Sequence, residues 1–375
     1  MQLRMSSDAL VVREMRSPGG AQGGYVTELA FSADGRHLLV GTTTFAVRLW
    51  GTFSGQVELL APPLAGTNED GGYYAGKLSC DVVVNPTRGV LIAAGSATGG
   101  VIIWDCLEGC RSAELRNNGH PYGMPVPHLA AYPDGQYFVS ADLTTVKVWG
   151  ADDFKCKRTL TSSFVVDILL VSAEGRFIFC AGQSDYNRTA RGVVAVWVGH
   201  PGQEPPRFLH GFGKRVLSLH APDNSDVLVT AGLDGRAKVW DVPSGMCTRS
   251  VWSKQASRAP LTYAALVNRE RWLLTSSFDG LLQVWSMESG KCLLTLATTL
   301  ERNVPRIRLS VSRCGRLVAV AARERIQVID FHTLADRSEA GRPREPGVYL
   351  KHALQFITVA TTFHPRQSEA EQTPC

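Results

Sequence analysis

The stretch "LVTAGLDGRAKVWD", residues 228–241, contains a strand-like run, a tight Asp-Gly turn, a second strand and a Trp-Asp pair. An Asp-Gly pair between two alternating apolar runs is a strong signal for a β-hairpin. Asp234 then has two possible roles: it is a reactive carboxylate beside glycines, or it holds the turn. Recurrence of the pattern along the chain would favour the second role.

The second strand of this stretch does recur, at intervals of 43 to 54 residues. A period near 40–45 residues with a Trp-Asp strand end is the signature of propeller blades. The recurring strand ends are "FAVRLW" at Trp50, "GVIIWD" at Trp104, "TVKVW" at Trp149, "VVAVW" at Trp197, "AKVWD" at Trp240, "LQVW" at Trp285 and "IQVID", with Ile329 in the Trp position.

Each of these strands has a turn upstream, such as "SADG" at 32–35 and "YPDG" at 132–135, flanked by short alternating runs. Period-2 alternation bounded by Gly and Asp turns indicates antiparallel strands. The sequence therefore predicts an all-β fold, a single seven-bladed β-propeller of four-stranded blades. Each blade is expected to close near its Trp or Ile329. The propeller is expected to span residues 1–363, followed by a disordered tail at 364–375.

On these motifs the chain resembles the WD40-repeat family over about residues 9–332. The resemblance implies a buried hydrogen-bond network of His, Ser or Thr, Asp and Trp. The residues that match it are His210, Thr230, Asp234 and Trp240 in the fifth repeat, and Thr275, Asp279 and Trp285 in the sixth. Asp234 is therefore predicted to be structural. Other repeats depart from the pattern, and the first has Val40 where the Thr would fall.

A propeller must join its first and last blades to avoid an open edge. Two segments could do this: "ALVVREM" at 9–15, as the outer strand of the last blade, or "LQFITVATTF" at 354–363. By resemblance to the family we favour the N-terminal segment.

Composition narrows the function classes. The chain has 375 residues, a formal net charge of +5 and 44% hydrophobic residues, without an apolar run long enough to cross a membrane or a secretory start. Nine scattered cysteines, an odd number, favour a reducing intracellular compartment, cytoplasmic or nuclear. Cys106 and Cys110 form a close pair without a matching second pair, so we predict no metal site and no cofactor.

Catalytic motifs are lacking as well. The chain contains neither a G-x-S-x-G elbow nor an H-E-x-x-H helix motif. "HGFGKRV" at 210–216 lacks the spacing of a phosphate loop and leads into a strand. We therefore predict that the protein is not an enzyme.

Basic residues gather in two sets of loops, those between consecutive blades and those between second and third strands, which share one face in this fold. They are Arg188, Arg191, Lys214, Arg215, Arg236, Lys254, Arg258, Arg302, Arg306, Arg323 and Arg325. The loop at 61–77 instead carries Tyr73 and Tyr74 beside two acidic residues. These charges are either simply solvated or form a surface for an acidic or phosphorylated partner segment, which suits arginine forks.

The family resemblance implies a scaffold that gathers proteins into a multi-subunit complex, away from membranes. Two alternatives remain open. The stretches 157–167 and 207–219 are similar to parts of a nuclear propeller subunit of chromatin and transcription complexes. An RNA- or DNA-binding module is the other, although the small net charge argues against it. The Trp-Asp-x-Arg pattern of ubiquitin-ligase receptors is absent.

Overall fold

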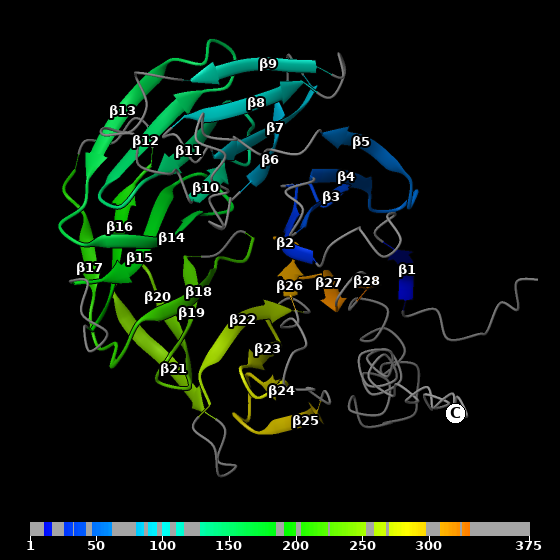
Figure 1. Ribbon diagram of the computed structural model, residues 1–375. Coiled ribbons are helices and arrows are strands. Elements are labelled where there is room, and N and C mark those ends of the chain that lie inside the picture. Colours follow the sequence, from blue (N-terminus) through cyan, green and yellow to red (C-terminus); the bar gives the residue numbers. More distant parts are fainter. Residues whose placement is uncertain are drawn as a thin grey trace, which may run out of the picture.

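A computed structural model provides the fold (Figure 1). It describes residues 11–16, 26–32, 34–42, 47–61, 80–85, 89–95, 100–105, 110–115, 128–184, 191–199, 204–223, 226–252, 259–267, 270–297, 308–322 and 325–330. Within these ranges every regular element is a β-strand, which confirms the all-β prediction. No helix that the structure describes is long and apolar enough to cross a membrane.

The described strands form seven antiparallel sheets of four strands. Six of them are built from strands that follow one another in the chain. These are β2 (Val26–Phe31), β3 (His37–Thr42), β4 (Val47–Gly51) and β5 (Val57–Ala61); β6 (Cys80–Asn85), β7 (Gly89–Gly95), β8 (Val101–Asp105) and β9 (Cys110–Leu115); β10 (His128–Ala131), β11 (Tyr137–Ala141), β12 (Thr145–Gly150) and β13 (Cys156–Thr161); β14 (Val165–Val171), β15 (Phe177–Gln183), β16 (Gly192–Val198) and β17 (Arg207–Leu209); β18 (Val216–His220), β19 (Val227–Gly232), β20 (Arg236–Asp241) and β21 (Met246–Trp252); and β22 (Leu261–Val267), β23 (Trp272–Ser277), β24 (Leu281–Ser286) and β25 (Cys292–Ala297).

The remaining sheet is composite, and this corrects the expectation of seven equivalent units. It contains three consecutive strands, β26 (Arg308–Val311), β27 (Leu317–Ala322) and β28 (Arg325–Asp330), and takes its fourth from β1 (Val11–Arg16). β1 pairs antiparallel with β28, from Val11 opposite Ile329 to Arg16 opposite Arg325. The favoured N-terminal closure is thereby confirmed, whereas the competing segment 354–363 lies outside the described residues.

The prediction that each blade closes at its Trp is wrong by one strand. Trp50 lies on β4, the third strand of its sheet, and β5 follows as the outer strand. The same holds for the strands of Trp104, Trp149, Trp197, Trp240 and Trp285. The physical reason is that an outer strand pairs with the strand before it, so each sheet ends about ten residues after the sequence repeat. A register irregularity just before the Trp marks this junction, for example between Leu49 and Trp50.

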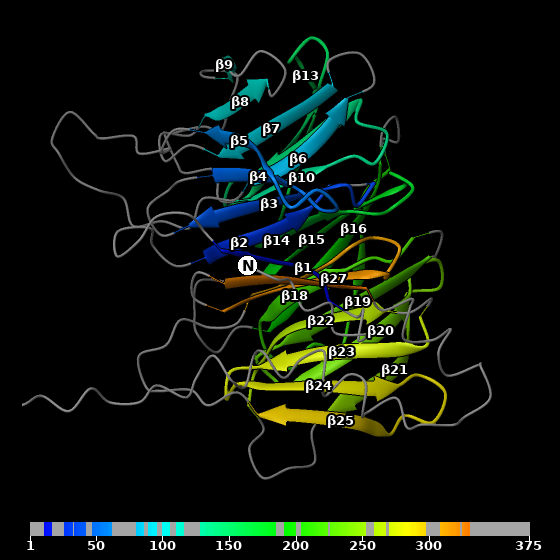
Figure 2. The same ribbon diagram turned by 90° about the vertical axis from the view of Figure 1, so that its right-hand side faces the viewer.

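The sheets are arranged around a ring, with β2, β6, β10, β14, β18, β22 and β26 as the innermost strands (Figure 1). Seen from the side, the strands cross the thickness of the ring (Figure 2). Apolar clusters lie between neighbouring sheets: Val40 and Trp50 of one sheet pack with Ala319 and Ile326 of the composite sheet. Burial of these faces against one another supplies the main driving force for folding.

Arg313, in the turn after β26, links distant parts of the ring. Its guanidinium donates to the carbonyl oxygens of Ala131 at 2.9 Å and Ser172 at 3.4 Å, at the ends of β10 and β14. Its own carbonyl accepts the N–H of Asp223, which follows β18, at 2.9 Å. One residue of the composite sheet thus bonds to three other sheets.

Candidate functional site

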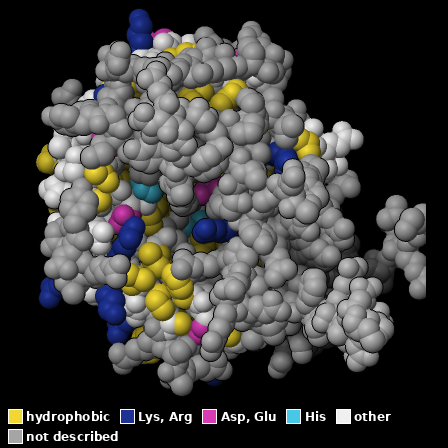
Figure 3. Space-filling view, in the orientation of Figure 1, with side chains coloured by type: hydrophobic (Ala, Val, Ile, Leu, Met, Phe, Trp, Pro, Cys, Tyr) yellow, Lys and Arg dark blue, Asp and Glu magenta, His cyan; other side chains and the backbone are white. Residues whose placement is uncertain are grey.

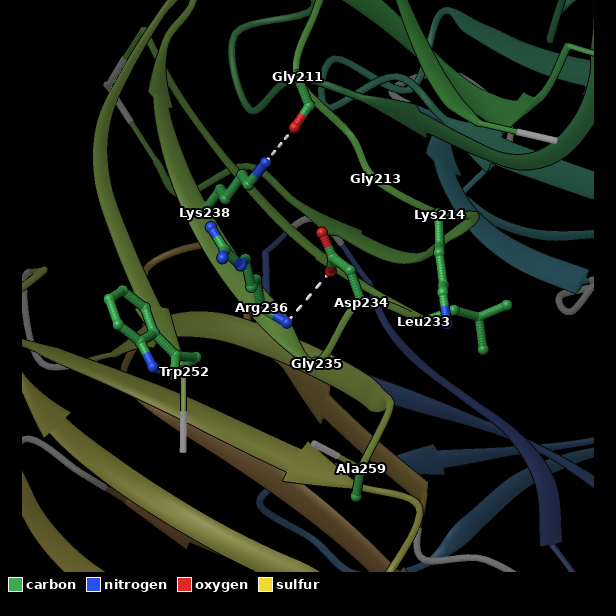
Figure 4. Close-up of a pocket in the computed structure, with 10 residues that line it drawn as sticks. All are labelled: Gly211, Gly213, Lys214, Leu233, Asp234, Gly235, Arg236, Lys238, Trp252 and Ala259. Atoms are coloured by element: carbon green, nitrogen blue, oxygen red, sulfur yellow. Dashed lines mark hydrogen bonds between the residues drawn. The ribbon is translucent and has the colours of Figure 1, made fainter. Parts of the chain in front are cut away.

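A pocket of about 510 Å³ opens on the sheet that contains the opening stretch, β18–β21. The loop after β17 forms one side, and the turn between β19 and β20 forms another (Figure 4). It is lined by Gly211, Gly213, Lys214, Leu233, Asp234, Gly235, Arg236, Lys238, Trp252 and Ala259. The two kinds of loop that were expected to share a face therefore do meet here.

Lys238 is the structural cation of this pocket. The residue is only 9% exposed, and its Nζ donates to the carbonyl oxygen of Gly211. The ammonium group also lies 5.3 Å from the centre of the Phe212 ring and 5.7 Å from that of Trp240. Cations attract aromatic faces more strongly when they are desolvated. Lys238 thus holds the glycine-rich loop against the sheet.

Lys214 and Arg236 are the two cations of the pocket that are available to bind a ligand. Within the described residues, neither side chain makes an ion pair or a hydrogen bond. The Arg236 guanidinium lies 5.4 Å from the ring centre of Trp252, whose surface is 48% exposed. Figure 4 shows Lys238, Arg236 and Trp252 in succession along one wall, with Lys214 on the other side.

Asp234 supplies the carboxylate among the lining residues, and it holds the turn. Its Oδ1 accepts the backbone N–H of Arg236 at 3.2 Å, and the N–H of Gly235 bonds to the carbonyl oxygen of Gly232 at 3.1 Å. Gly235 has a φ of 70°, a left-handed conformation that favours glycine. With three cations against one carboxylate, the pocket is positively charged.

The expected buried network is present only as pairs. Trp240 Nε1 donates to Thr230 Oγ1 at 3.0 Å, and Trp285 Nε1 donates to Thr275 Oγ1 at the same distance. Asp279 accepts a hydrogen bond from Ser277 Oγ in its own turn. His210 is exposed beside Phe208, so the structure does not bring it to Asp234 or Thr230.

A third pair escaped sequence analysis. Trp149 Nε1 donates to Ser140 Oγ at 2.8 Å. Ser140 precedes its Trp by nine residues, whereas Thr230 and Thr275 precede theirs by ten. The shorter "SADLTT" turn explains the difference. A sequence pattern that accepts either nine or ten residues between the hydroxyl residue and the tryptophan would include this pair.

Arg191 and Arg215, two other basic residues that the structure describes, do not line this pocket. Arg215 is paired with Asp167, Nη2 to Oδ1 at 2.6 Å, and Arg191 is exposed. Arg325 is described only as part of the backbone of β28. The residues that lie outside the described ranges are Arg188, Lys254, Arg258, Arg302, Arg306, Arg323, Tyr73 and Tyr74.

The centre of the ring holds a second polar space, of about 310 Å³, lined by the innermost strands. Figure 3 shows histidine and charged side chains at this hollow. Burial raises the pKa of Asp167, although Arg215 opposes the shift. Burial also lowers the pKa of His220 to about 4; a backbone hydrogen bond at Leu266 opposes this shift and the charge of Arg313 adds to it. His220 is therefore neutral at pH 7.

Among the residues that the structure describes, no three His, Cys, Asp or Glu side chains converge in a way that could hold a metal ion. Sequence analysis named neither Trp252 nor Lys238 as members of a site. Trp252 ends an outer strand whose place beside the Asp234 turn depends on the sheet pairing.

Comparison with known proteins gives matches to repeat proteins. The WD40 family model, described as WD domain, G-beta repeat, matches residues 13–51 and 203–241. The chain is 28% identical over 200 residues to transducin beta-like protein 3 of Rattus norvegicus, covering 49% of this chain and 23% of that protein. It is 29% identical over 212 residues to the Bos taurus protein of the same name, covering 51% and 24%. WD repeat-containing protein 18 of Homo sapiens is 24% identical over 262 residues, covering 65% and 55%. The chain thus spans about a quarter to just over half the length of these relatives.

Proposed function

Because the chain carries WD40 repeats in a β-propeller, we propose that it is a non-catalytic platform for protein assembly whose basic pocket binds an acidic or phosphorylated segment of a partner. The observation that carries the proposal is that one pocket contains two cations without an ion pair among the described residues, Lys214 and Arg236, together with the exposed ring of Trp252.

The chemistry of the pocket suits an anion attached to a peptide. The planar guanidinium of Arg236 can bind a carboxylate or phosphate through two parallel hydrogen bonds, and Lys214 adds a flexible point charge. Trp252 offers apolar area for the side chain next to the anion, as aromatic anchors do in many interfaces. Asp234 repels an anion from the turn and thereby favours a position between Lys214 and Arg236.

The test is affinity purification of the tagged protein from its native cells, with partners identified by mass spectrometry. The pocket variant is Lys214→Glu with Arg236→Glu. The matched control is Arg36→Glu with Lys155→Glu, two exposed residues outside the pocket. Partners lost in the pocket variant and kept in the control support the proposal, and partners kept in both refute it. Phosphatase treatment of the extract then separates phosphate from carboxylate recognition, and the partners themselves reveal whether the complex is a nuclear one.

Nucleic acid is the second candidate, because an arginine stacked on an exposed tryptophan also suits an unpaired base. A labelled single-stranded oligonucleotide would then bind with an affinity that falls steeply as salt rises. Binding that is weak and nearly independent of salt would exclude this candidate.

A further inference from the structure

Three outer strands carry an arginine at the same register position. Arg158 on β13 pairs with Val148, Arg207 on β17 with Val196, and Arg249 on β21 with Val239. In each case the valine directly precedes the repeat tryptophan. We call this the outer-strand arginine position.

Two of these arginines join their sheet to the next one. Arg158 Nη1 donates to the carbonyl oxygens of Val198 at 2.9 Å and Gly199 at 3.5 Å. Arg207 Nη1 donates to those of Val242 at 3.3 Å and Pro243. Both pairs of acceptors lie just after the tryptophan of the following sheet.

Arg249 breaks this series. Its guanidinium makes no hydrogen bond or ion pair within the described residues. It lies instead beside Gly290, where a Cβ would stand 3.2 Å from its Nη1. The link between the sheet β18–β21 and the sheet β22–β25 is thus missing at this position.

A groove of about 580 Å³ opens at this place. Its walls come from β21 on one side and from β24, β25 and the turn before β25 on the other. Val251, Trp252 and Trp285 give it apolar area, while Arg249 and Lys291 give it two positive charges. None of the lining residues is acidic. Ser250, between Arg249 and Val251 on β21, also lines the groove.

We propose that this groove is a lateral binding site for an extended peptide segment of a partner protein, with a carboxylate side chain next to an apolar one. The carboxylate binds Arg249 and Lys291 and takes the place that backbone carbonyls occupy at Arg158 and Arg207. The apolar side chain packs on Trp252 and Trp285, which line the same groove. The site lies on the side of the ring. It shares Trp252 with the basic pocket, but its cations, Arg249 and Lys291, differ from Lys214 and Arg236, so it does not depend on the function proposed for that pocket.

The first experiment selects random 12-residue peptides, displayed on phage, against the purified full chain. Selected peptides are synthesised and measured by fluorescence polarisation against the wild type, Arg249→Ala and Arg158→Ala. The last is the matched control, since it removes an arginine from the same register position in another sheet. We expect acidic-apolar peptides whose affinity falls at least tenfold with Arg249→Ala and stays unchanged with Arg158→Ala.

A second readout keeps the test valid if a variant fails to fold. Cys292 lines the groove and is exposed, whereas Cys314, also exposed, lies in the composite sheet. A bound peptide should slow alkylation of Cys292 in the wild-type chain and leave Cys314 unchanged, as measured by mass spectrometry. Equal alkylation of Cys292 with and without peptide would overturn the proposal.

The Lys214→Glu, Arg236→Glu variant separates this site from the basic pocket. If the selected peptides lose affinity in that variant but not in Arg249→Ala, they bind the pocket, and the lateral site is refuted while the proposed function stands. If Arg249→Ala alone weakens them, the lateral site is supported whatever the pocket binds.

Discussion

At the scale of single residues, the repeat tryptophans differ in how their indole N–H is satisfied. Trp149, Trp240 and Trp285 each donate to a hydroxyl on the preceding strand. Trp50 is buried, and its Nε1 has no hydrogen-bond partner among the residues that the structure describes. Ten residues before Trp50 stands Val40, fully buried, where the other repeats have Thr230 or Thr275. The first repeat therefore carries an unpaired buried donor.

Replacing Val40 with Thr should therefore stabilise the protein. The new hydroxyl would accept the Trp50 N–H, and a hydrogen bond of this kind contributes roughly 1 kcal/mol. The reverse change, Thr230→Val, should lower the free energy of unfolding by roughly 1 kcal/mol or more because it leaves Trp240 unpaired. Urea unfolding measures both. A destabilised Val40→Thr would show that the hydroxyl cannot reach the indole.

His220 should make stability fall in mild acid. It is 6% exposed, and burial lowers its pKa to about 4, from an ordinary value of 6.5. As the pH falls, His220 therefore binds a proton in the unfolded chain before it does so in the folded chain. The contribution of neutral His220 to stability is fully present above pH 6.5 and is lost as the pH falls toward 4. Between pH 7 and pH 5 this amounts to about 2 kcal/mol.

Urea unfolding of the wild type and His220→Gln at both pH values checks this. Other groups also titrate between pH 7 and pH 5. The quantity to compare is therefore the loss of unfolding free energy over this range in the wild type and in the variant. The wild type should lose about 2 kcal/mol more than the variant. Equal losses in both proteins would mean that His220 is not buried in its neutral form.

The sequence supports some of these residue-level conclusions and not others. The resemblance to the WD40 family was enough to single out Thr230, Thr275 and the exceptional Val40. His220 and Lys238 could not be found in this way, because their behaviour depends on burial by strands far away in the chain. His210 illustrates the opposite error, since its motif position suited the network but its side chain is exposed.

At the scale of strands, the repeated tryptophan strand could be predicted from the sequence because its apolar alternation is strong. The outer strands were not, because one side faces solvent and their sequences are rich in charge, as in "CKRTLT" of β13. A register irregularity precedes Trp50, Trp104, Trp149, Trp240 and Trp285 where they pair with the outer strand, and no local sequence pattern predicts it. The blade boundaries were therefore placed one strand too early.

The outer-strand arginines yield a prediction about stability. Arg158→Ala should lower the free energy of unfolding by about 1 kcal/mol, because two backbone carbonyls of the next sheet lose a charged donor. Arg249→Ala should change it by less than about 0.5 kcal/mol, because that guanidinium makes no hydrogen bond or ion pair to the described part of the chain. Denaturant unfolding of the two variants side by side measures the contrast. Equal losses would show that packing of the side chain, not its hydrogen bonds, joins the sheets.

At the scale of the whole molecule, the ring is closed by segments from opposite ends of the described chain. The sequence provided both candidates for this closure, but only pairing in space distinguishes them. β1 covers β28, whose Ile326, Val328 and Ile329 are fully buried. Without this cover, β28 would present a row of unpaired N–H and C=O groups, which is a template for pairing with another chain.

Removing residues 1–16 should therefore lower the melting temperature by roughly 5 °C or more and produce dimers or larger species through the β28 edge. Scanning calorimetry and light scattering measure these effects, with removal of residues 364–375 as the control. A synthetic peptide of residues 9–17 should restore the melting temperature in proportion to its concentration, because it binds only the folded ring. If the truncated chain instead stays monomeric and equally stable, another segment has taken the edge. The double truncation of 1–16 and 354–375 then shows whether that segment is 354–363, because stability would collapse only when both are absent.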